Sequence, residues 1–187
     1  RAFRRHAVTK RYRPAGRSGR ALVSEAVRVG IVVGSESDLP VMNTCGEVLD
    51  GYGIGWEIGV MSAHRAGDVV RAYALAAPER GLQVLIAGAG AAAHLPGVLA
   101  SLTTLPVIGV PLAATPLAGF DSLLSIVQMP PGIPVATVAV GPMGARNAGH
   151  LAAEIIGLFD PEVAARIKEE RARMRSKVQL PEGFDFA

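Results

Sequence analysis

The sequence predicts an α/β protein in which a parallel sheet lies between two layers of helices, and three observations support this prediction. Short apolar runs alternate with helical segments from residue 29 onward, which is typical of βαβ units with right-handed crossovers. Half of the residues are hydrophobic but only 5% are aromatic, which suits strands that are buried on both faces by Val, Ile, Leu and Ala. The 22 Gly and 13 Pro residues supply the tight turns that such alternation needs.

Five strands and six helices are expected in alternating order. The apolar runs predict strands at residues 29–33, 54–60, 82–86, 106–110 and 135–140. Helical patterns occupy residues 38–51, 68–79, 92–102, 121–127, 147–158 and 161–177. Asp38 and Asp121 are expected to cap their helices, and Pro161 has a favoured first position. Five parallel strands between helices form a flavodoxin-like, three-layer αβα sandwich, to which the last segment adds a C-terminal helix.

At 187 residues, the chain is long enough for one domain and short for two. We divide it into a basic N-terminal extension at residues 1–27, an α/β domain at residues 28–160, and a C-terminal helix and tail at residues 161–187. The extension lacks apolar periodicity and is expected to be disordered. Its arginine content leaves open a peptide for organellar import or an arm that binds nucleic acid.

Composition argues against several classes of function. Residues 1–28 hold nine of the 19 Lys and Arg residues but only one of the 16 Asp and Glu residues. The remainder of the chain therefore has a net negative charge, and we do not expect it to bind nucleic acid. No uninterrupted apolar stretch predicts a membrane span. The single cysteine, Cys45, excludes an internal disulfide and fits a reducing, cytoplasmic compartment. The histidine spacing predicts no metal site. The sequence also lacks the G-x-S-x-G motif that carries the nucleophile in serine hydrolases.

Four short polar or glycine-rich clusters each follow a predicted strand. Loops at the carboxyl ends of parallel strands line the ligand crevice of an open sheet. We therefore expect these clusters to meet in one site that binds an anionic small molecule. The clusters are GSESD at residues 34–38, SAHR at 62–65, AGAGAAAHLPG at 87–97 and GVP at 109–111.

The first two clusters carry groups that suit a phosphorylated ligand. At a strand–helix junction, free backbone N–H groups attract anions, and Ser35 could add a hydroxyl while Asp38 accepts from a ribose. Both residue types are also common helix caps, so a purely structural role stays open here. Arg65 offers a bidentate fork for phosphate, Ser62 a hydroxyl, and His64 a group that titrates near neutral pH.

The third cluster is expected to bring the backbone close to a ligand. Gly88 and Gly90 can adopt conformations that are barred to other residues. His94 lies near the start of the next predicted helix and adds a second imidazole. The alternative is a small-residue packing motif with a hydrogen-bonded histidine.

Together with GFDSLLSIVQMPPGIPV at residues 119–135, these clusters resemble the N5-carboxyaminoimidazole ribonucleotide mutases of purine biosynthesis. This family is the class I form of phosphoribosylaminoimidazole carboxylase catalytic subunits, and the resemblance covers about residues 29–158. It implies an isomerase that moves a carboxylate from the exocyclic nitrogen of its ribonucleotide substrate to carbon 4 of the imidazole ring. It further implies that no metal or organic cofactor is used, that the chain forms a homo-octamer, and that it is coupled to the ATP-dependent synthetase that makes the substrate.

The resemblance also assigns roles to single residues. His64 would be the general acid–base, and His94 would help to bind or orient the migrating carboxylate. Ser35, Ser62 and Arg65 would hold the phosphate, and Asp38 the ribose hydroxyls. The remaining residues expected to bind substrate are Ser37, Ala89, Gly90 and Leu95.

The chain departs from the family pattern beside two of these clusters. Ala66 and Gly67 stand where the family has Thr-Pro, so the second helix is expected to begin at Asp68 after a looser loop. Ala91 replaces the second glycine of a Gly-Gly pair and adds a methyl group beside the expected pocket.

Other functions remain compatible with the same clusters. The class II relatives carboxylate aminoimidazole ribonucleotide directly with carbon dioxide, and the related nickel-pincer cofactor synthases carboxylate a pyridinium nucleotide. A flavodoxin-like module that binds a ribonucleotide without turnover would also use an anion-binding crevice.

Overall fold

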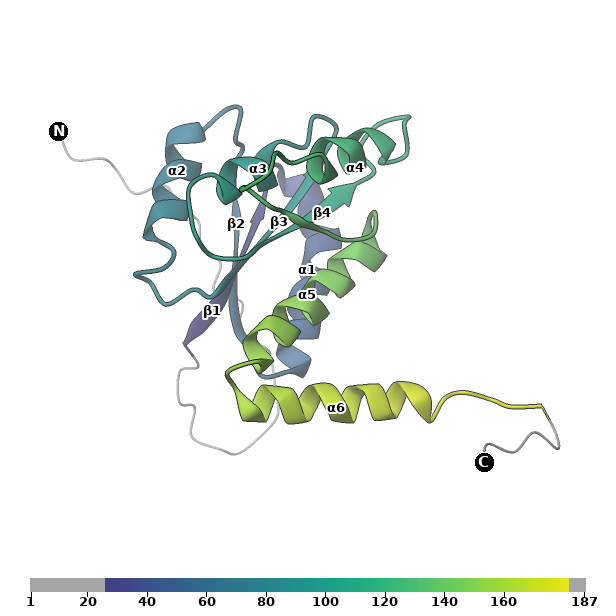
Figure 1. The fold of residues 1–187 in the computed structure, drawn as a ribbon. Coiled ribbons are helices and arrows are strands. Elements are labelled where there is room, and N and C mark those ends of the chain that lie inside the picture. Colours follow the sequence, from purple (N-terminus) through teal and green to yellow (C-terminus); the bar gives the residue numbers. More distant parts are fainter. Residues whose placement is uncertain (1–25, 182–187) are drawn as a thin grey trace.

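The computed structural model describes residues 26–181, and its centre is a five-stranded, all-parallel sheet (Figure 1). The strand order is β2-β1-β3-β4-β5, which is a flavodoxin-like order and confirms the predicted fold class. Most of the predicted extension at residues 1–27 lies outside the described residues. The strands are β1 (Val27–Val33), β2 (Gly55–Val60), β3 (Val84–Gly90), β4 (Val107–Leu112) and β5 (Ala136–Thr137).

Helices cover both faces of the sheet and so complete three layers (Figure 1). One cluster of buried side chains joins the sheet to α1 (Leu39–Gly51), α5 (Pro142–Gly157) and the start of α6 (Pro161–Arg175). A second cluster, on the opposite face, joins it to α2 (Gly67–Ala76), α3 (Leu95–Ala100) and α4 (Phe120–Val127). Both faces of the central strands are therefore buried, as expected for apolar runs in a parallel sheet.

Three residues near this core have the packing roles that their apolar character suggests. Cys45 is fully buried, and this burial raises the pKa of its thiol to about 12, so the thiol is an inert core group. The indole of Trp56 packs beside α1, where a Cβ on Gly46 would lie 2.2 Å from Cζ2 of the ring. The hydroxyl of Tyr73 donates to the buried carboxylate of Glu57 at 2.9 Å.

Several predicted elements have different bounds in the structure. The strand expected at residues 82–86 is β3, which ends at Gly90, so residues 87–90 of the third predicted cluster lie within the strand. The helix expected at residues 92–102 begins only at Leu95, because Ala91 adopts a left-handed conformation with φ 52° and interrupts the helical path. The helix expected at residues 147–158 already begins at Pro142, since proline at the first position is compatible with a helix start. The last strand has two residues rather than six, because residues 138–141 bond to β4 without continuing its ladder.

The two helix caps predicted at Asp38 and Asp121 are also wrong, as is the predicted first residue of the second helix. Asp38 occupies the N-cap position of α1, but its side chain makes no capping hydrogen bond. Gly119 is the N-cap residue of α4, since its φ of 88° suits the turn into the helix, and Asp121 lies in the first turn. The second helix, α2, begins at Gly67 rather than Asp68.

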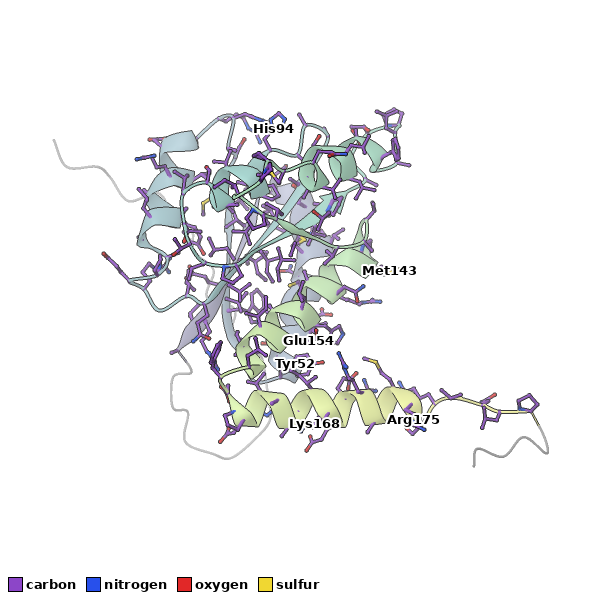
Figure 2. The ribbon with its side chains drawn as sticks, in the orientation of Figure 1. Tyr52, His94, Met143, Glu154, Lys168 and Arg175 are labelled. Atoms are coloured by element: carbon purple, nitrogen blue, oxygen red, sulfur yellow. The ribbon has the colours of Figure 1, made fainter. Side chains whose placement is uncertain are left out.

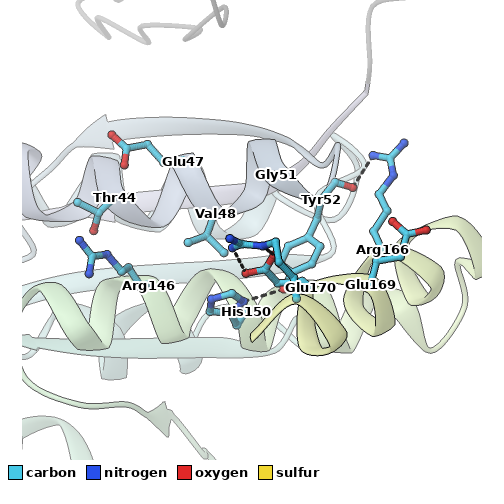
Figure 3. Close-up of a pocket in the computed structure, with 11 residues that line it drawn as sticks. Thr44, Glu47, Val48, Gly51, Tyr52, Arg146, His150, Arg166, Glu169 and Glu170 are labelled. Carbon is cyan, nitrogen blue, oxygen red and sulfur yellow. Dashed lines mark hydrogen bonds and ion pairs between the residues drawn. The ribbon is translucent and has the colours of Figure 1, made fainter. Parts of the chain in front are cut away.

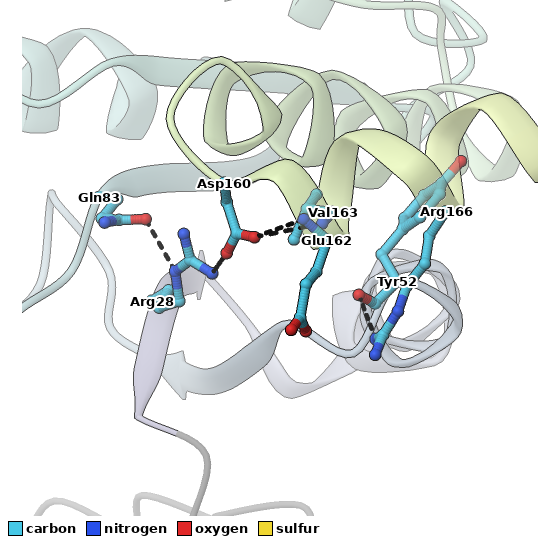
Figure 4. Close-up of polar contacts among 7 residues, drawn as sticks. All are labelled: Arg28, Tyr52, Gln83, Asp160, Glu162, Val163 and Arg166. Atoms are coloured by element: carbon cyan, nitrogen blue, oxygen red, sulfur yellow. Dashed lines mark hydrogen bonds and ion pairs between the residues drawn. The ribbon is translucent and has the colours of Figure 1, made fainter.

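Helix α6 is attached to the sheet domain along its first half (Figure 4) and, further along, by the ion pair of Arg171 with Glu154 on α5. Its C-terminal end projects beyond the domain (Figure 1). Asp160 caps α6 by accepting the backbone N–H groups of Glu162 and Val163 at 3.1 and 3.2 Å. The same carboxylate accepts from Arg28 on β1 at 2.6 Å, and Arg28 holds its pKa below the usual range. Arg166 donates to the Tyr52 carbonyl oxygen at 2.7 Å, which ties the next turn of α6 to the end of α1.

Candidate functional site

A cavity of about 370 Å³ lies at the carboxyl ends of the strands, next to the point where the strand order reverses between β1 and β3. We call it the edge cavity. The last residues of β3 and the segments that follow β1, β2, β3 and β4 line it, and Figure 2 shows His94 at this end of the molecule. All ten residues predicted for the site line this cavity: Ser35, Ser37, Asp38, Ser62, His64, Arg65, Ala89, Gly90, His94 and Leu95.

The two histidines meet directly in the edge cavity. Nε2 of His64 lies 2.9 Å from Nδ1 of His94, and the rings are perpendicular, with centroids 5.0 Å apart. One nitrogen of the pair carries the hydrogen and the other accepts it, so the tautomer of each ring depends on the other. Because the rings approach this closely, two full positive charges would repel each other, and the pair is suited to handling one proton at a time.

Local turns hold the two rings in place. His64 lies in a turn after β2 that the Ala66 N–H closes on the Ser62 carbonyl oxygen at 2.9 Å. His94 is the N-cap residue of α3, and its carbonyl oxygen accepts from the Val98 N–H at 3.0 Å. Each imidazole is thus carried by a short, internally bonded segment at the end of a buried strand.

A guanidinium and three hydroxyl groups line one side of the edge cavity. Arg65 donates to the Gly34 carbonyl oxygen at 3.0 Å, which uses one of the five N–H donors of its guanidinium. The hydroxyl of Ser37 donates to Oγ of Ser35 at 2.9 Å, and Oγ of Ser62 accepts from the Arg65 N–H at 3.3 Å. These donors, with the backbone N–H groups of the turn after β1, suit a phosphate group.

Asp38 is an acidic group on the same side. Partial burial raises the pKa of its carboxyl group, while hydrogen bonds from Ser35 and Ser37 oppose that rise. A carboxylate in this place can accept hydrogen bonds from the hydroxyl groups of a sugar.

Small side chains form the remaining wall of the edge cavity. It is lined by Ala89, Gly90, Ala91, Ala92 and Ala114, so little side-chain volume projects into it. A Cβ on Gly90 would lie only 2.5 Å from the Cβ of Ala114. Glycine at this position therefore lets the loop after β4 approach the end of β3.

The fourth predicted cluster does not reach the cavity. Residues 109–111 lie within β4, and all three are buried in the sheet. Ala114, which follows β4 in the next loop, lines the cavity instead. Ala114 was not predicted, because an isolated alanine in a loop carries no chemical signal. Gly90, against which it packs, was the nearest indication.

Comparisons with known proteins identify the family of this chain. Residues 28–177 match the family model described as AIR carboxylase. The chain belongs to the AIR carboxylase family.

Similar proteins cover most of the domain. The N5-carboxyaminoimidazole ribonucleotide mutase of Thermotoga maritima is 57% identical over 151 residues, which are 81% of this chain and 87% of the relative. The enzyme of the same name from Bacillus subtilis is 52% identical over 150 residues, covering 80% of this chain and 93% of that one. The crystal structure of Treponema denticola PurE has a TM-score of 0.71 at 28% identity, and the match covers 80% of this chain and 92% of that chain.

This member of the AIR carboxylase family has a second cavity, of about 440 Å³, between α1, α5 and α6 (Figure 3). We call it the helix cavity. The hydroxyl of Tyr52 lies 2.8 Å from Nδ1 of His150, a histidine for which the sequence indicated no partner. Arg173 binds both carboxylate oxygens of Glu170, at 2.7 and 2.5 Å, and holds the pKa of Glu170 below its usual range.

Two further properties concern residues 26–181 as a whole. Within this range, no group of three or more His, Cys, Asp or Glu side chains is arranged to hold a metal ion. None of the helices described there has both the length and the apolar character needed to cross a membrane.

Proposed function

We propose that this protein converts N5-carboxyaminoimidazole ribonucleotide into 4-carboxy-5-aminoimidazole ribonucleotide, a step of purine biosynthesis. Relatives that are 50–57% identical carry the name of this mutase. The observation that carries the proposal is the 2.9 Å contact between His64 and His94, inside a cavity of small side chains and beside a cluster of phosphate-binding type. A proton donor, a confined space and an anion site are the three features that this reaction needs.

The substrate is oriented by its phosphate and sugar. Arg65 and the hydroxyls of Ser35 and Ser62 bind the 5′-phosphate through charge-assisted hydrogen bonds. The carboxylate of Asp38 accepts from the ribose, and Ser37 supports this end through its bond to Ser35. The imidazole ring then extends toward the histidine pair, where Ala89, Gly90 and Leu95 leave room for a flat ring and its carboxylate.

His64 acts as the acid and then as the base. Protonated His64 gives its proton to the exocyclic nitrogen, the nitrogen–carbon bond breaks with its electron pair left on nitrogen, and carbon dioxide is released inside the cavity. Carbon 4 then attacks carbon dioxide, and His64 removes the proton from carbon 4, so that the ring regains its aromatic electrons. The enzyme ends in its starting protonation state, and His94 orients the carboxylate while it shares a proton with His64.

Assembly and cellular context form the second part of the proposal. The protein forms a homo-octamer and receives its unstable substrate from the ATP-dependent synthetase in the cytoplasm. Large apolar side chains on the surface support self-association, since Phe120 is 63% and Met143 67% exposed in the single chain. The reduced, buried thiol of Cys45 suits a cytoplasmic location.

The deciding experiment is a carbamate-isomerisation assay on the purified full-length protein. We expect the purified carbamate to give the carbon-4 carboxylate without added bicarbonate, and a ¹³C label in the carbamate to be retained in the product. Turnover that requires aminoimidazole ribonucleotide and bicarbonate would instead establish direct carboxylation. Binding of the ribonucleotide without any turnover would indicate a binding module and contradict the proposal.

A further inference from the structure

The loop between β4 and α4, residues 113–119, contributes one residue to the wall of the edge cavity. Ala114 in this loop lines the cavity together with His64 and His94. Because a Cβ on Gly90 would lie 2.5 Å from the Cβ of Ala114, the loop rests directly against the end of β3. The position of the loop therefore sets the width of the cavity on this side.

A hydrogen bond between side chains holds the middle of the loop. Oγ1 of Thr115 donates to Oδ2 of Asp121, in the first turn of α4, at 2.8 Å. The same oxygen accepts from the N–H of Leu117 at 3.1 Å. Thr115 thus links the tip of the loop both to itself and to the helix that follows.

A second side chain ties together the two ends of the loop. Ser122 is fully buried, and its hydroxyl lies 2.9 Å from the carbonyl oxygen of Leu112, at the end of β4, and 2.9 Å from that of Gly119. Because Ser122 holds both ends of the loop, the Thr115–Asp121 hydrogen bond determines the position of the residues between them.

This arrangement costs stability. Oδ1 of Asp121 is buried and has no hydrogen-bond partner among residues 26–181, and leaving a buried acceptor unpaired is unfavourable. Ala118 adopts a left-handed conformation with φ 51°, which disfavours a residue that carries a Cβ. Local strain that is retained at the edge of a ligand cavity points to a function for the conformation.

We propose that Asp121, acting through Thr115, is a positioning residue that keeps residues 113–119 against the edge cavity and so retains carbon dioxide beside carbon 4. The inference rests on the function proposed above. Carbon dioxide carries no charge once the nitrogen–carbon bond has broken, so no ion pair holds it and the cavity wall must do so. If the loop moves away, carbon dioxide escapes and the proton from His64 stays on nitrogen. The products are then aminoimidazole ribonucleotide and carbon dioxide, and His64 is reprotonated by solvent.

Matched threonine variants test this role. Thr115→Val keeps the shape of the side chain but removes both hydrogen bonds of Oγ1, whereas Thr115→Ser retains the hydroxyl. Thr103→Val is the control elsewhere in the molecule, because Oγ1 of Thr103 accepts from the Leu105 N–H at 3.2 Å in the same local pattern but lies outside the edge cavity. Asp121→Asn keeps an oxygen that can accept from Thr115.

The measured quantity is the ratio of aminoimidazole ribonucleotide to the carbon-4 carboxylate formed from the carbamate, after subtraction of the enzyme-free reaction. Loss of one hydrogen bond shifts a local equilibrium by roughly five- to tenfold, so Thr115→Val, which loses two, should raise this ratio by at least about fivefold. The Thr115→Ser, Asp121→Asn and Thr103→Val variants should stay within about twofold of the unchanged protein. A variant that merely folds less well would form less of both products and leave the ratio unchanged. An unchanged ratio in Thr115→Val would therefore overturn the inference.

A readout that does not depend on turnover separates this inference from the proposed function. Amide hydrogen exchange at Leu117 should be about five- to tenfold faster in Thr115→Val, since its N–H loses the threonine acceptor. Unchanged exchange there would contradict a positioning role for Thr115. An unchanged protein that fails to isomerise the carbamate would contradict the proposed function. Normal isomerisation with no extra release in Thr115→Val would contradict only the role of the loop.

Discussion

The two cavities of this protein have similar volumes, about 370 Å³ at the carboxyl edge of the sheet and about 440 Å³ between the helices, yet they differ in the polar groups that line them. In the helix cavity, Arg173 is neutralised by Glu170, and Arg166 is bound to the carbonyl oxygen of Tyr52. In the edge cavity, Arg65 contacts only a backbone carbonyl oxygen, and it lies beside hydroxyl groups. Arg65 and Arg166 both contact only a backbone carbonyl oxygen, so neither cavity size nor an arginine without an acidic partner distinguishes the two cavities. The edge cavity differs by its histidine pair and by the hydroxyl groups beside Arg65.

The position of each cavity explains this difference. The edge cavity collects residues from the end of β3 and from the segments that follow four strands, which is where an open parallel sheet offers a crevice for ligands. The helix cavity is lined by side chains of α1, α5 and α6, whose mutual bonds hold these helices together (Figures 3 and 4). We therefore expect substitutions in the edge cavity to change catalysis and those in the helix cavity to change stability.

The largest expected effect separates the two histidine sites. His64→Asn removes the proposed acid–base and should lower kcat for carbamate isomerisation by about 10²–10⁴-fold, with an unchanged thermal midpoint. His150→Asn, in the helix cavity, is the matched control and should keep kcat near that of the unchanged protein. Near-normal turnover in His64→Asn would contradict the proposed acid–base role of His64 in the edge cavity.

The two arginine sites should differ through substrate binding. Arg65→Ala removes charge-assisted hydrogen bonds to the phosphate, which are worth about 1.5–3 kcal/mol, so KM should rise about 10- to 100-fold with a smaller change in kcat. Steady-state kinetics with the carbamate measure both constants. Arg173→Ala should leave KM unaltered, and an equal rise in KM for both variants would argue against phosphate binding at Arg65.

A smaller effect is expected on stability from the helix cavity. Tyr52→Phe removes the hydroxyl that bonds to His150 and should lower the free energy of unfolding by about 1 kcal/mol while leaving kcat unchanged. Denaturant titration with activity measured on the same samples tests this. A loss of activity without a loss of stability would assign the helix cavity a role in the reaction.

The smallest expected effect concerns strain in the edge cavity. Ala91 has φ 52°, and a left-handed conformation costs an alanine about 1–2 kcal/mol. Glycine avoids this cost, but its greater conformational entropy in the unfolded state cancels about 0.5–1 kcal/mol of the gain. Ala91→Gly should therefore raise the free energy of unfolding by between about 0 and 1.5 kcal/mol. The shift in the denaturant midpoint measures it, and a clear destabilisation would show that the methyl group contributes packing that outweighs the strain.

Local patterns were sufficient for much of the fold and for the residues that gather at the site. The buried strands were visible as apolar runs near each cluster, although the third and fourth clusters partly or wholly belong to their strands. A parallel sheet brings the carboxyl ends of such strands to one edge. His64, Arg65 and His94 could therefore be placed in one crevice before their contacts were known. Their catalytic and binding roles stay predictions.

Other features were not predictable from local patterns. Ala91 and the two alanines after it favour a helix, yet the chain makes a turn there before α3, because tertiary contacts override helix propensity. The Thr115–Asp121 bond was missed since neither residue has a distinctive neighbour in the sequence. Residues 109–111 were expected at the site but belong to a buried strand, because the apolar run extends further than the turn residues suggested.

The sequence by itself determined the alternation of strands and helices and the chemical groups at the strand ends, because periodicity and turn-forming residues act over a few positions of the chain. Only the tertiary structure decided that His64 and His94 share a hydrogen bond and that Ala114 closes the cavity against Gly90. Those contacts join segments that are far apart in the chain. Their distances depend on how the whole sheet and its helices pack, which no local pattern contains.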